Sequence, residues 1–313
     1  CTQEQDYNDA LEVCNKLGIK LHRIDFVKEY WDYVFTYFLD ELKKGRTPNP
    51  DIMCNKYIKF DMFKKEADKL GADYIATGHY ARMKDGYLYR GIDENKDQTY
   101  FLSQVSKEKL SNVIFPIGNL IKKDVRKIAH EQGLIVADKK DSTGICFIGE
   151  RNFKEFLTNY LPNQEGNIVD IDTNKILGKH VGLMYYTIGQ RRGLDIGGND
   201  KRLYVVGKNL EKNILYVSLG EDTKYLQTDE ALIEDVNLIS DKRVTKCTAK
   251  FRYRQKDIDV DLEYLDNGNI IVRYDNVKSV TPGQACVFYL GEECLGGGII
   301  KEVRKNGKKL WYL

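Results

Sequence analysis

Two cysteines of this 313-residue chain stand in settings that suit sulfur chemistry. Cys54 follows a Pro-Asn-Pro-Asp segment, which predicts a helix start with Asp51 as the N-cap residue. A thiol in the first turn of a helix has a lowered pKa, because the helix macrodipole stabilises the thiolate. Cys146 stands in a Ser- and Gly-containing loop, where a sulfur donor could reach it. Both cysteines are therefore candidate nucleophiles.

Each cysteine also has a plainer interpretation, Cys54 as a small apolar side chain of an amphipathic helix and Cys146 as a filler of a turn. If both react, one would carry a persulfide and the other would attack it and form a disulfide. Asp51 would then accept or donate a proton, although an N-cap is the more frequent role of such a residue. This relay requires the two thiols to face one cleft near Gly78 and to meet after a modest loop movement.

The elements that must position these groups alternate between helix and strand. A sheet of parallel strands covered by helices follows from such alternation, with ligands beyond the carboxyl ends of the strands. Gly78 and His79 follow one such end, a natural place for a nucleotide, although His79 could equally be a loop histidine satisfied within the protein. Apolar spacing and Gly stops predict helices over 9–17, 30–44, 51–70, 98–105 and 122–132 and strands over 19–26 and 74–77.

The second half of the chain has a different pattern. A helix is predicted near 152–161, and a Gly-rich stretch follows it to residue 198. From about residue 227, short alternating runs predict strands over 248–253, 258–264, 270–274 and 285–289, which together suggest a small β-barrel. We therefore expect a Rossmann-like α/β parallel-sheet domain over 1–150, a small central domain over 151–226 and a C-terminal β-barrel over 227–313.

Composition excludes several other classes of protein. With 42% hydrophobic and 31% charged residues, the chain reads as an ordinary soluble globular protein. No apolar run approaches the roughly 18 to 20 residues of a membrane span, so we expect a cytoplasmic protein. Seven scattered cysteines without a C-x-x-C pair suggest neither a disulfide scaffold nor a metal site. The net charge of +2 is small, and the basic run at 242–256 is either a solvated strand face or an RNA contact.

Several motifs taken together resemble the bacterial tRNA-specific 2-thiouridylases, a family of the PP-loop ATP pyrophosphatase superfamily. They occur in the order of that family and cover essentially the whole chain. The motifs are GRTPNPDIMCN at 45–55, ATGHY at 76–80, NKDQ at 95–98, the segment 141–150, GQRRGL at 189–194, RYRQ at 252–255 and TPGQ at 281–284.

The resemblance implies roles for particular residues. Cys54 corresponds to the nucleophilic cysteine, Cys146 to the persulfide carrier and Asp51 to an acid/base group. Gly78 corresponds to a position that contacts ATP. Contact with tRNA, including the target base for the first three, is implied for Asn49, Pro50, Asp51, His79, Lys96, Asp97, Gln98, Arg252, Tyr253 and Gln284.

The same resemblance implies a reaction. ATP, with Mg²⁺ on its phosphates, adenylates the C2 oxygen of the wobble uridine, and sulfur from a cysteine persulfide replaces that oxygen. AMP and a cysteine disulfide remain. The implied partners are the anticodon loops of Lys, Glu and Gln type tRNAs and a cysteine desulfurase or sulfur-relay protein as the donor. The protein itself is expected to be a monomer.

One departure from the family pattern bears on ATP. Members of the family begin with a strand and a Ser-Gly-Gly-Val-Asp-Ser-Ser type loop that cradles pyrophosphate, and the chain contains no such sequence. We therefore expect the chain as given to lack its phosphate-binding loop, to bind ATP poorly and to be inactive by itself. Two alternatives stay open: an RNA-binding fragment without catalysis, and a related ATP pyrophosphatase acting on a small molecule, which would need neither the two cysteines nor a basic barrel.

Overall fold

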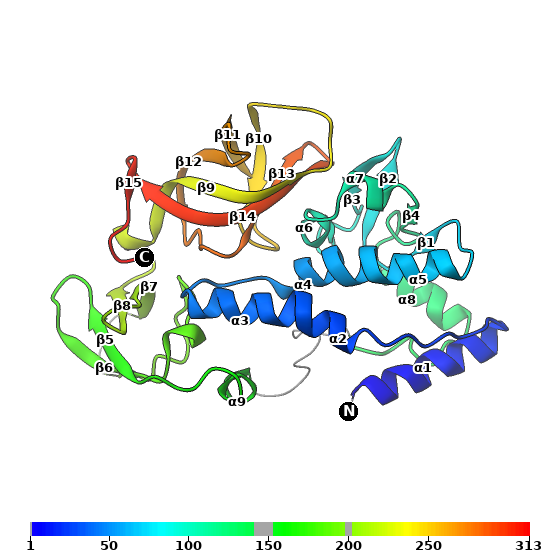
Figure 1. The fold of residues 1–313 in the computed structure, drawn as a ribbon, viewed down its shortest axis with the longest axis horizontal. Helices are drawn as coiled ribbons and strands as arrows, with labels where there is room; N and C mark the ends of the chain where they lie inside the picture. Colours follow the sequence, from blue (N-terminus) through cyan, green and yellow to red (C-terminus); the bar gives the residue numbers. More distant parts are fainter. Residues whose placement is uncertain (1, 141–152, 198–201) are drawn as a thin grey trace.

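The computed structural model describes residues 2–140, 153–197 and 202–313. Three regions follow one another along the chain: a helix-rich first region, a central region with a small sheet, and a C-terminal barrel. The helices that lead to Cys54 belong to the first region and run between the central region and the barrel (Figure 1).

The chain opens with helix α1 (Thr2–Leu17), then α2 (Val27–Tyr30), a π-helical segment η1 (Trp31–Phe35) and α3 (Thr36–Lys43). The strand predicted over 19–26 is wrong, because this stretch has no regular structure. Ile19 and Ile24 are exposed, so only part of the alternating apolar pattern that suggested a strand is buried.

Helix α4 (Pro50–Met53) continues without a break into a π-helical segment η2 (Cys54–Met62) and then α5 (Phe63–Lys69). The predicted helix over 51–70 is therefore confirmed. It leads into β1 (Ile75–Ala76), which pairs in parallel with β4 (Val113–Ile114). This parallel pairing is the sheet that the β/α alternation predicted.

Short elements lie between and after these strands: the hairpin β2 (Ala81–Lys84) and β3 (Tyr87–Arg90), then α6 (Thr99–Leu102), α7 (Lys107–Leu110) and α8 (Lys122–Glu131). Asp85 and Gly86 both have positive φ, as a tight hairpin turn requires. The hairpin also meets the barrel, because Tyr89 pairs with Glu293.

The middle of the chain forms a four-stranded sheet, here called the central sheet. After α9 (Phe153–Thr158) come β5 (Gly166–Asp170), β6 (Ile176–His180), β7 (Leu203–Asn209) and β8 (Ile214–Leu219), in the order β6-β5-β8-β7. Only the β5–β8 pair is parallel. The end of the chain returns to this sheet, where the Lys208 amide donates to the Tyr312 carbonyl.

Six strands close into the predicted barrel, in the order β13-β10-β11-β12-β9-β14 with β14 also paired to β13. They are β9 (Gln227–Leu238), β10 (Lys246–Lys250), β11 (Ile258–Tyr264), β12 (Ile270–Lys278), β13 (Ala285–Leu290) and β14 (Glu293–Lys305), with β15 (Lys308–Lys309) paired outside. Closure leaves few free strand edges.

Helix α3 and the helix that follows it belong to different cores. Phe38 and Leu42 of α3 pack in one cluster with central-sheet residues such as Val205. Ile52 and Cys54 pack in another, with barrel residues that include Ala285, Val287 and Tyr289. The loop 45–49 between these helices therefore passes from one core to the other, below strands β9 and β14 (Figure 1).

Candidate functional site

The helix that carries Cys54 begins at Asn49. The Asn49 side chain accepts a hydrogen bond from the Asp51 amide at 3.1 Å, and Pro50 takes the first helical position, where its missing N–H costs nothing. The prediction of Asp51 as the N-cap is wrong, because the preceding Asn49-Pro50 pair already caps the helix. Asp51 lies in the first turn instead, with its carboxylate available for another role.

Cys54 lies one residue beyond α4, at the start of the π-helical segment, and its side chain is 8% exposed. It therefore lies just past the first turn, where the macrodipole acts most strongly, and the predicted activation of its thiol stays a prediction. Asp51 and Cys54, three residues apart, lie on the same side of the helix. Cys146 lies outside the described residues, so the predicted approach of the two thiols stays a prediction.

Asp51 is half-buried, and this burial raises the pKa of its carboxyl group above the ordinary range. The Lys59 charge opposes the shift in part. The same lysine acts on His79, whose pKa is lowered to about 3 mainly by burial and further by Lys59. Lys59 is exposed, and no ion pair or hydrogen bond joins it to a described residue. Sequence reasoning missed it, although its position two turns beyond Asp51 was a usable signal.

Gly78 and His79 follow the carboxyl end of β1, as predicted. A Cβ atom on Gly78 would have no described atom within 4 Å, so the backbone there faces open space. His79 is only 7% exposed; its Nδ1 lies 2.8 Å from the Thr77 hydroxyl and its ring packs against Phe60 and Phe115. Its neutral ring thus has partners inside the protein, and its contact with tRNA stays a prediction.

Lys96, Asp97 and Gln98 lie in a segment that is hydrogen-bonded to the chain at Tyr80 and at Gly91. Asp97 is 5% exposed and accepts hydrogen bonds from the Gly91 amide and from Thr99. Gln98 exchanges two bonds with Tyr80: its side-chain oxygen accepts from the Tyr80 amide at 3.0 Å and its own amide donates to the Tyr80 carbonyl. Lys96 is half-buried. These contacts fix the strand-end loop that contains Gly78.

The three predicted residues of the barrel also contact other parts of the chain. The Arg252 guanidinium donates to the carbonyls of Ile188 and Ser279. Tyr253 packs against Phe101, with ring centroids 4.4 Å apart.

Gln284 donates from its side-chain amide to the Thr47 carbonyl at 2.7 Å. This bond ends two residues before Asn49. Arg252, Tyr253 and Gln284 therefore join the barrel to Ile188 of the central region, to α6 and to the loop before the helix start, and their contact with tRNA stays a prediction.

A chain of contacts links the predicted residues to one another. The side-chain amide of Asn55, next to Cys54, donates to the Phe101 carbonyl, and Phe101 is the ring against which Tyr253 packs. On the other side, Phe60 contacts His79. Within the described residues, the structure thus brings the helix start, the strand end and the barrel loops into one connected region.

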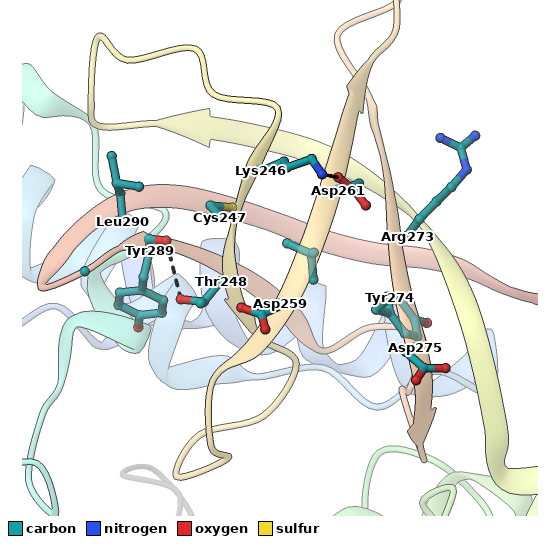
Figure 2. Close-up of a pocket in the computed structure, with 12 residues that line it drawn as sticks. Lys246, Cys247, Thr248, Asp259, Asp261, Arg273, Tyr274, Asp275, Tyr289 and Leu290 are labelled. Atoms are coloured by element: carbon teal, nitrogen blue, oxygen red, sulfur yellow. Dashed lines mark hydrogen bonds and ion pairs between the residues drawn. The ribbon is translucent and has the colours of Figure 1, made fainter.

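Part of the basic run at 242–256 is paired with carboxylates. Lys242 pairs with Glu293, Lys246 with Asp261 at 3.6 Å, and Lys250 with Asp257 at 3.8 Å. Part of this run lines a hollow of about 720 Å³ on the barrel, where Lys246 lies beside Asp261 and the lining also includes Asp259, Asp275 and Arg273 (Figure 2). None of the predicted site residues lines this hollow, and its mixed charges favour no single ligand.

Within 2–140, 153–197 and 202–313, no group of three His, Cys, Asp or Glu side chains could hold a metal ion. None of the helices in the described part of the chain is long and apolar enough to cross a membrane.

Comparison with known families first defines a class. Three family models match consecutive parts of the chain: the tRNA methyl transferase HUP domain over 1–150, the tRNA methyl transferase PRC-barrel domain over 154–219 and the aminomethyltransferase beta-barrel domain over 228–300. The chain thus combines a Rossmann-like α/β domain, a central domain and a C-terminal barrel, and the predicted fold class is confirmed.

Whole-chain relatives then give the family. The chain is 57% identical to the tRNA-specific 2-thiouridylase MnmA of Mycoplasmopsis synoviae, with 100% of this chain and 85% of that protein aligned. It is 58% identical to the protein of that name from Mesoplasma florum (96% of this chain, 84% of the relative) and 56% identical to that from Bacillus cytotoxicus (100% and 86%). The chain belongs to the tRNA-specific 2-thiouridylase family, which confirms the resemblance seen in its motifs. The family models carry a methyl transferase description, but the relatives aligned over the whole chain are named for thiolation.

Proposed function

We propose that this protein is a tRNA-uridine 2-sulfurtransferase that uses ATP to thiolate the wobble uridine of tRNA. The observation that carries the proposal is the helix start at Asn49. It places the Asp51 carboxylate and the Cys54 thiol three residues apart on one helix, whose next segment packs through Phe60 on the loop that contains Gly78. A nucleophile, an ionisable carboxylate and an open strand end are the groups that such a reaction requires. Membership of the family supports the same reaction.

The chemistry proceeds in three bond exchanges. The C2 oxygen of the uridine attacks the α-phosphorus of ATP and releases pyrophosphate, with Mg²⁺ balancing the phosphate charge. The terminal sulfur of a Cys146 persulfide then attacks C2, and AMP leaves. Finally the Cys54 thiolate attacks the Cys146 sulfur, which breaks the S–S bond to the base and leaves 2-thiouridine and a Cys54–Cys146 disulfide. A thiol reductant restores both cysteines.

Asp51 suits proton transfer during these exchanges. Its burial raises its pKa towards the range in which a carboxyl group both accepts and donates protons. Asn49 and Pro50 lie beside it at the helix start, where a flipped-out base would meet them. Lys59 supplies an exposed positive charge near Asp51 and His79, which suits the phosphate of the adenylated base.

We further propose the partners and the division of the chain. Gly78 contacts ATP; His79, Lys96, Asp97, Gln98, Arg252, Tyr253 and Gln284 contribute to the surface that binds the anticodon loops of Lys, Glu and Gln type tRNAs. A cysteine desulfurase or sulfur-relay protein donates the sulfur to a cytoplasmic monomer. The catalytic domain spans 1–150, the central domain 151–226 and the barrel domain 227–313.

The test is 2-thiouridine formation in unmodified tRNA, with ATP and a persulfide donor, by the full-length protein. Cys54→Ser and Cys146→Ser should each abolish the product while tRNA binding persists. Cys247→Ser is the matched control, because this half-buried cysteine lies in the barrel strand β10, away from the helix start. Thiolation that survives both Cys54→Ser and Cys146→Ser would overturn the two-cysteine chemistry, and tRNA binding without any thiolation by the intact protein would favour an RNA-binding protein without catalysis.

A further inference from the structure

The loop 45–49 joins two helices that are buried in different cores, so its position depends on contacts from both sides. Helix α3 ends in a Schellman motif: the Gly45 amide donates to the Leu42 carbonyl and the Arg46 amide to the Glu41 carbonyl, each at 3.0 Å. Gly45 has the positive φ of +73° that this motif requires. The Gly45 carbonyl then points away from the helix and needs a partner elsewhere.

That partner is Lys208 of the central sheet. Its Nζ atom donates to the Gly45 carbonyl at 2.9 Å, and its side chain is 7% exposed. Leu210, two residues further along the chain, lies against Gly45, where an added Cβ would be 3.1 Å from its Cδ2 atom. Among the described residues, no carboxylate forms an ion pair with Lys208. Burial lowers the pKa of Lys208 to about 7, and the amine donates a hydrogen bond in either protonation state.

A buried amine without a carboxylate is costly, and an apolar side chain of similar length would fill the same space at lower cost. Within the described residues, the one hydrogen bond of the Lys208 side-chain amine is to the loop that precedes Asn49. A buried ionisable group that serves a single contact of this kind is a candidate for a functional role.

The barrel holds Thr47, two residues after Gly45, from the opposite side. The Thr47 amide donates to the Pro282 carbonyl at 2.9 Å, and the Thr47 carbonyl accepts from the Gln284 side chain at 2.7 Å. Gly283 allows this close approach, since a Cβ there would lie 2.9 Å from the Thr47 nitrogen. Arg46 adds ion pairs to Glu41 and to Glu234 of β9. The start of the loop is thus fixed by the central sheet and its middle by the barrel.

We propose that Lys208 is a positioning residue for sulfur transfer, which holds the loop 45–49 so that Asn49, Pro50 and Asp51 meet the target base. It acts through the Gly45 carbonyl and touches neither substrate nor thiol. The inference rests on the proposed function only for its catalytic consequence; the physical claim, that Lys208 seats the loop, stands by itself.

The first test is hydrogen exchange at the Arg46, Thr47 and Asp51 amides in Lys208→Met, which keeps the buried stem and removes the donor. Exchange at these amides should quicken by about fivefold to tenfold, the effect of one lost hydrogen bond, while strands β5 and β8 keep their protection. Lys179→Met, at an exposed position of β6 in the same sheet, is the matched control and should leave the loop unchanged. Unchanged exchange in Lys208→Met would overturn the inference, whatever the fate of the proposed function.

The second test separates positioning from general stability. In the full-length protein, Lys208→Met should lower the single-turnover rate of 2-thiouridine formation by about fivefold or more, because small misplacements of reacting groups slow a step that binding alone does not reveal. The dissociation constant for tRNA should stay within about twofold of the wild-type value, and the melting temperature should not fall, since a costly buried amine has been removed. A weakened tRNA affinity with an unchanged rate would overturn the positioning role. Faster loop exchange with neither rate nor affinity changed would instead contradict the proposed role of the loop in thiolation.

Discussion

The two sides of the candidate site are built in contrasting ways. On the thiol side, the loop 45–49 and the helix after it are held by the central sheet, by the barrel and by two hydrophobic cores. On the nucleotide side, the described parallel sheet has two strands of two residues each, and Gly78 faces open space.

The described residues therefore hold the thiol side of the site through many contacts and the side near Gly78 through few. Helix α3, Lys208 of the central sheet and the barrel turn at 282–284 are far apart along the chain, and all three contact Gly45 or Thr47. A change that disturbs the packing of the loop 45–49 against the barrel should therefore alter both stability and rate, whereas a change at Gly78 should alter nucleotide use alone.

The largest effect is expected for Asp51→Asn. Loss of a proton-transfer group should slow thiolation by about 100-fold, while the half-buried amide leaves stability unchanged or slightly higher because it carries no buried charge. Single-turnover rates measured across pH provide the check. The wild-type rate should fall in acid as Asp51 is protonated, at a pH above the usual range for a carboxyl group because burial raises its pKa, and the variant should lack this limb. A variant rate within about threefold of wild type would remove Asp51 from the chemistry.

A smaller but broader effect is expected for Gly283→Ala. The residue has φ of +91°, and the new Cβ would lie 2.9 Å from both the Arg46 Cβ and the Thr47 nitrogen, so the loop or the barrel turn must move. Chemical denaturation should show a loss of about 1–3 kcal/mol in the free energy of unfolding, with slower thiolation.

Gly268→Ala separates backbone strain from this contact. Gly268 has a similar φ of +83° but no described atom within 4 Å of an added Cβ. It should lose only about 1 kcal/mol and keep the full rate. Equal losses in rate and stability for both variants would show that the approach to Thr47 has no special weight.

The Lys208 amine should make stability depend on pH. Its pKa is about 7 in the folded protein against 10.5 for an unperturbed lysine, so between these values the unfolded chain binds more protons and stability rises with pH. The difference between wild type and Lys208→Met should therefore change by up to about 1.4 kcal/mol per pH unit across this window. Urea unfolding at pH 7 and pH 8.5 measures it, and Lys179→Met should retain the wild-type slope. Parallel curves for wild type and Lys208→Met would contradict the burial of the amine.

The smallest structural effect is expected for Gly78→Ala. Because the added methyl group meets no described atom, the melting temperature should stay within about 2 °C of wild type. The KM for ATP should nevertheless rise several-fold if this backbone approaches the nucleotide, and the dissociation constant for tRNA should not change. A stability loss as large as that of Gly283→Ala would erase the contrast between the two sides.

Local patterns of the sequence predicted much of the fold. Apolar spacing located the helix over 51–70, and alternation located the barrel strands. The strand expected over 19–26 failed because alternation alone does not say whether a partner strand exists. The capping role went to Asn49 instead of Asp51, because the proline at position 50 fixes the first helical residue.

The candidate site was predicted where its residues are neighbours in sequence, as in Asn49 to Cys54. The long-range contacts that hold the site in place could not be predicted. Lys208 and Gln284 meet the loop over separations of 163 and 237 residues, and no local pattern encodes such contacts. Lys59 lies on the same helix as Asp51, so its position could have been predicted, but an exposed lysine in the middle of a helix looks like an ordinary solvated residue.

The account depends most on the claim that Cys54 resolves a persulfide during thiolation. Peptide mapping of the full-length protein after a single turnover, with no reductant present, tests this claim directly. We predict one disulfide between the Cys54 and Cys146 peptides for each 2-thiouridine formed. Stoichiometric 2-thiouridine with both thiols still open to alkylation would contradict it.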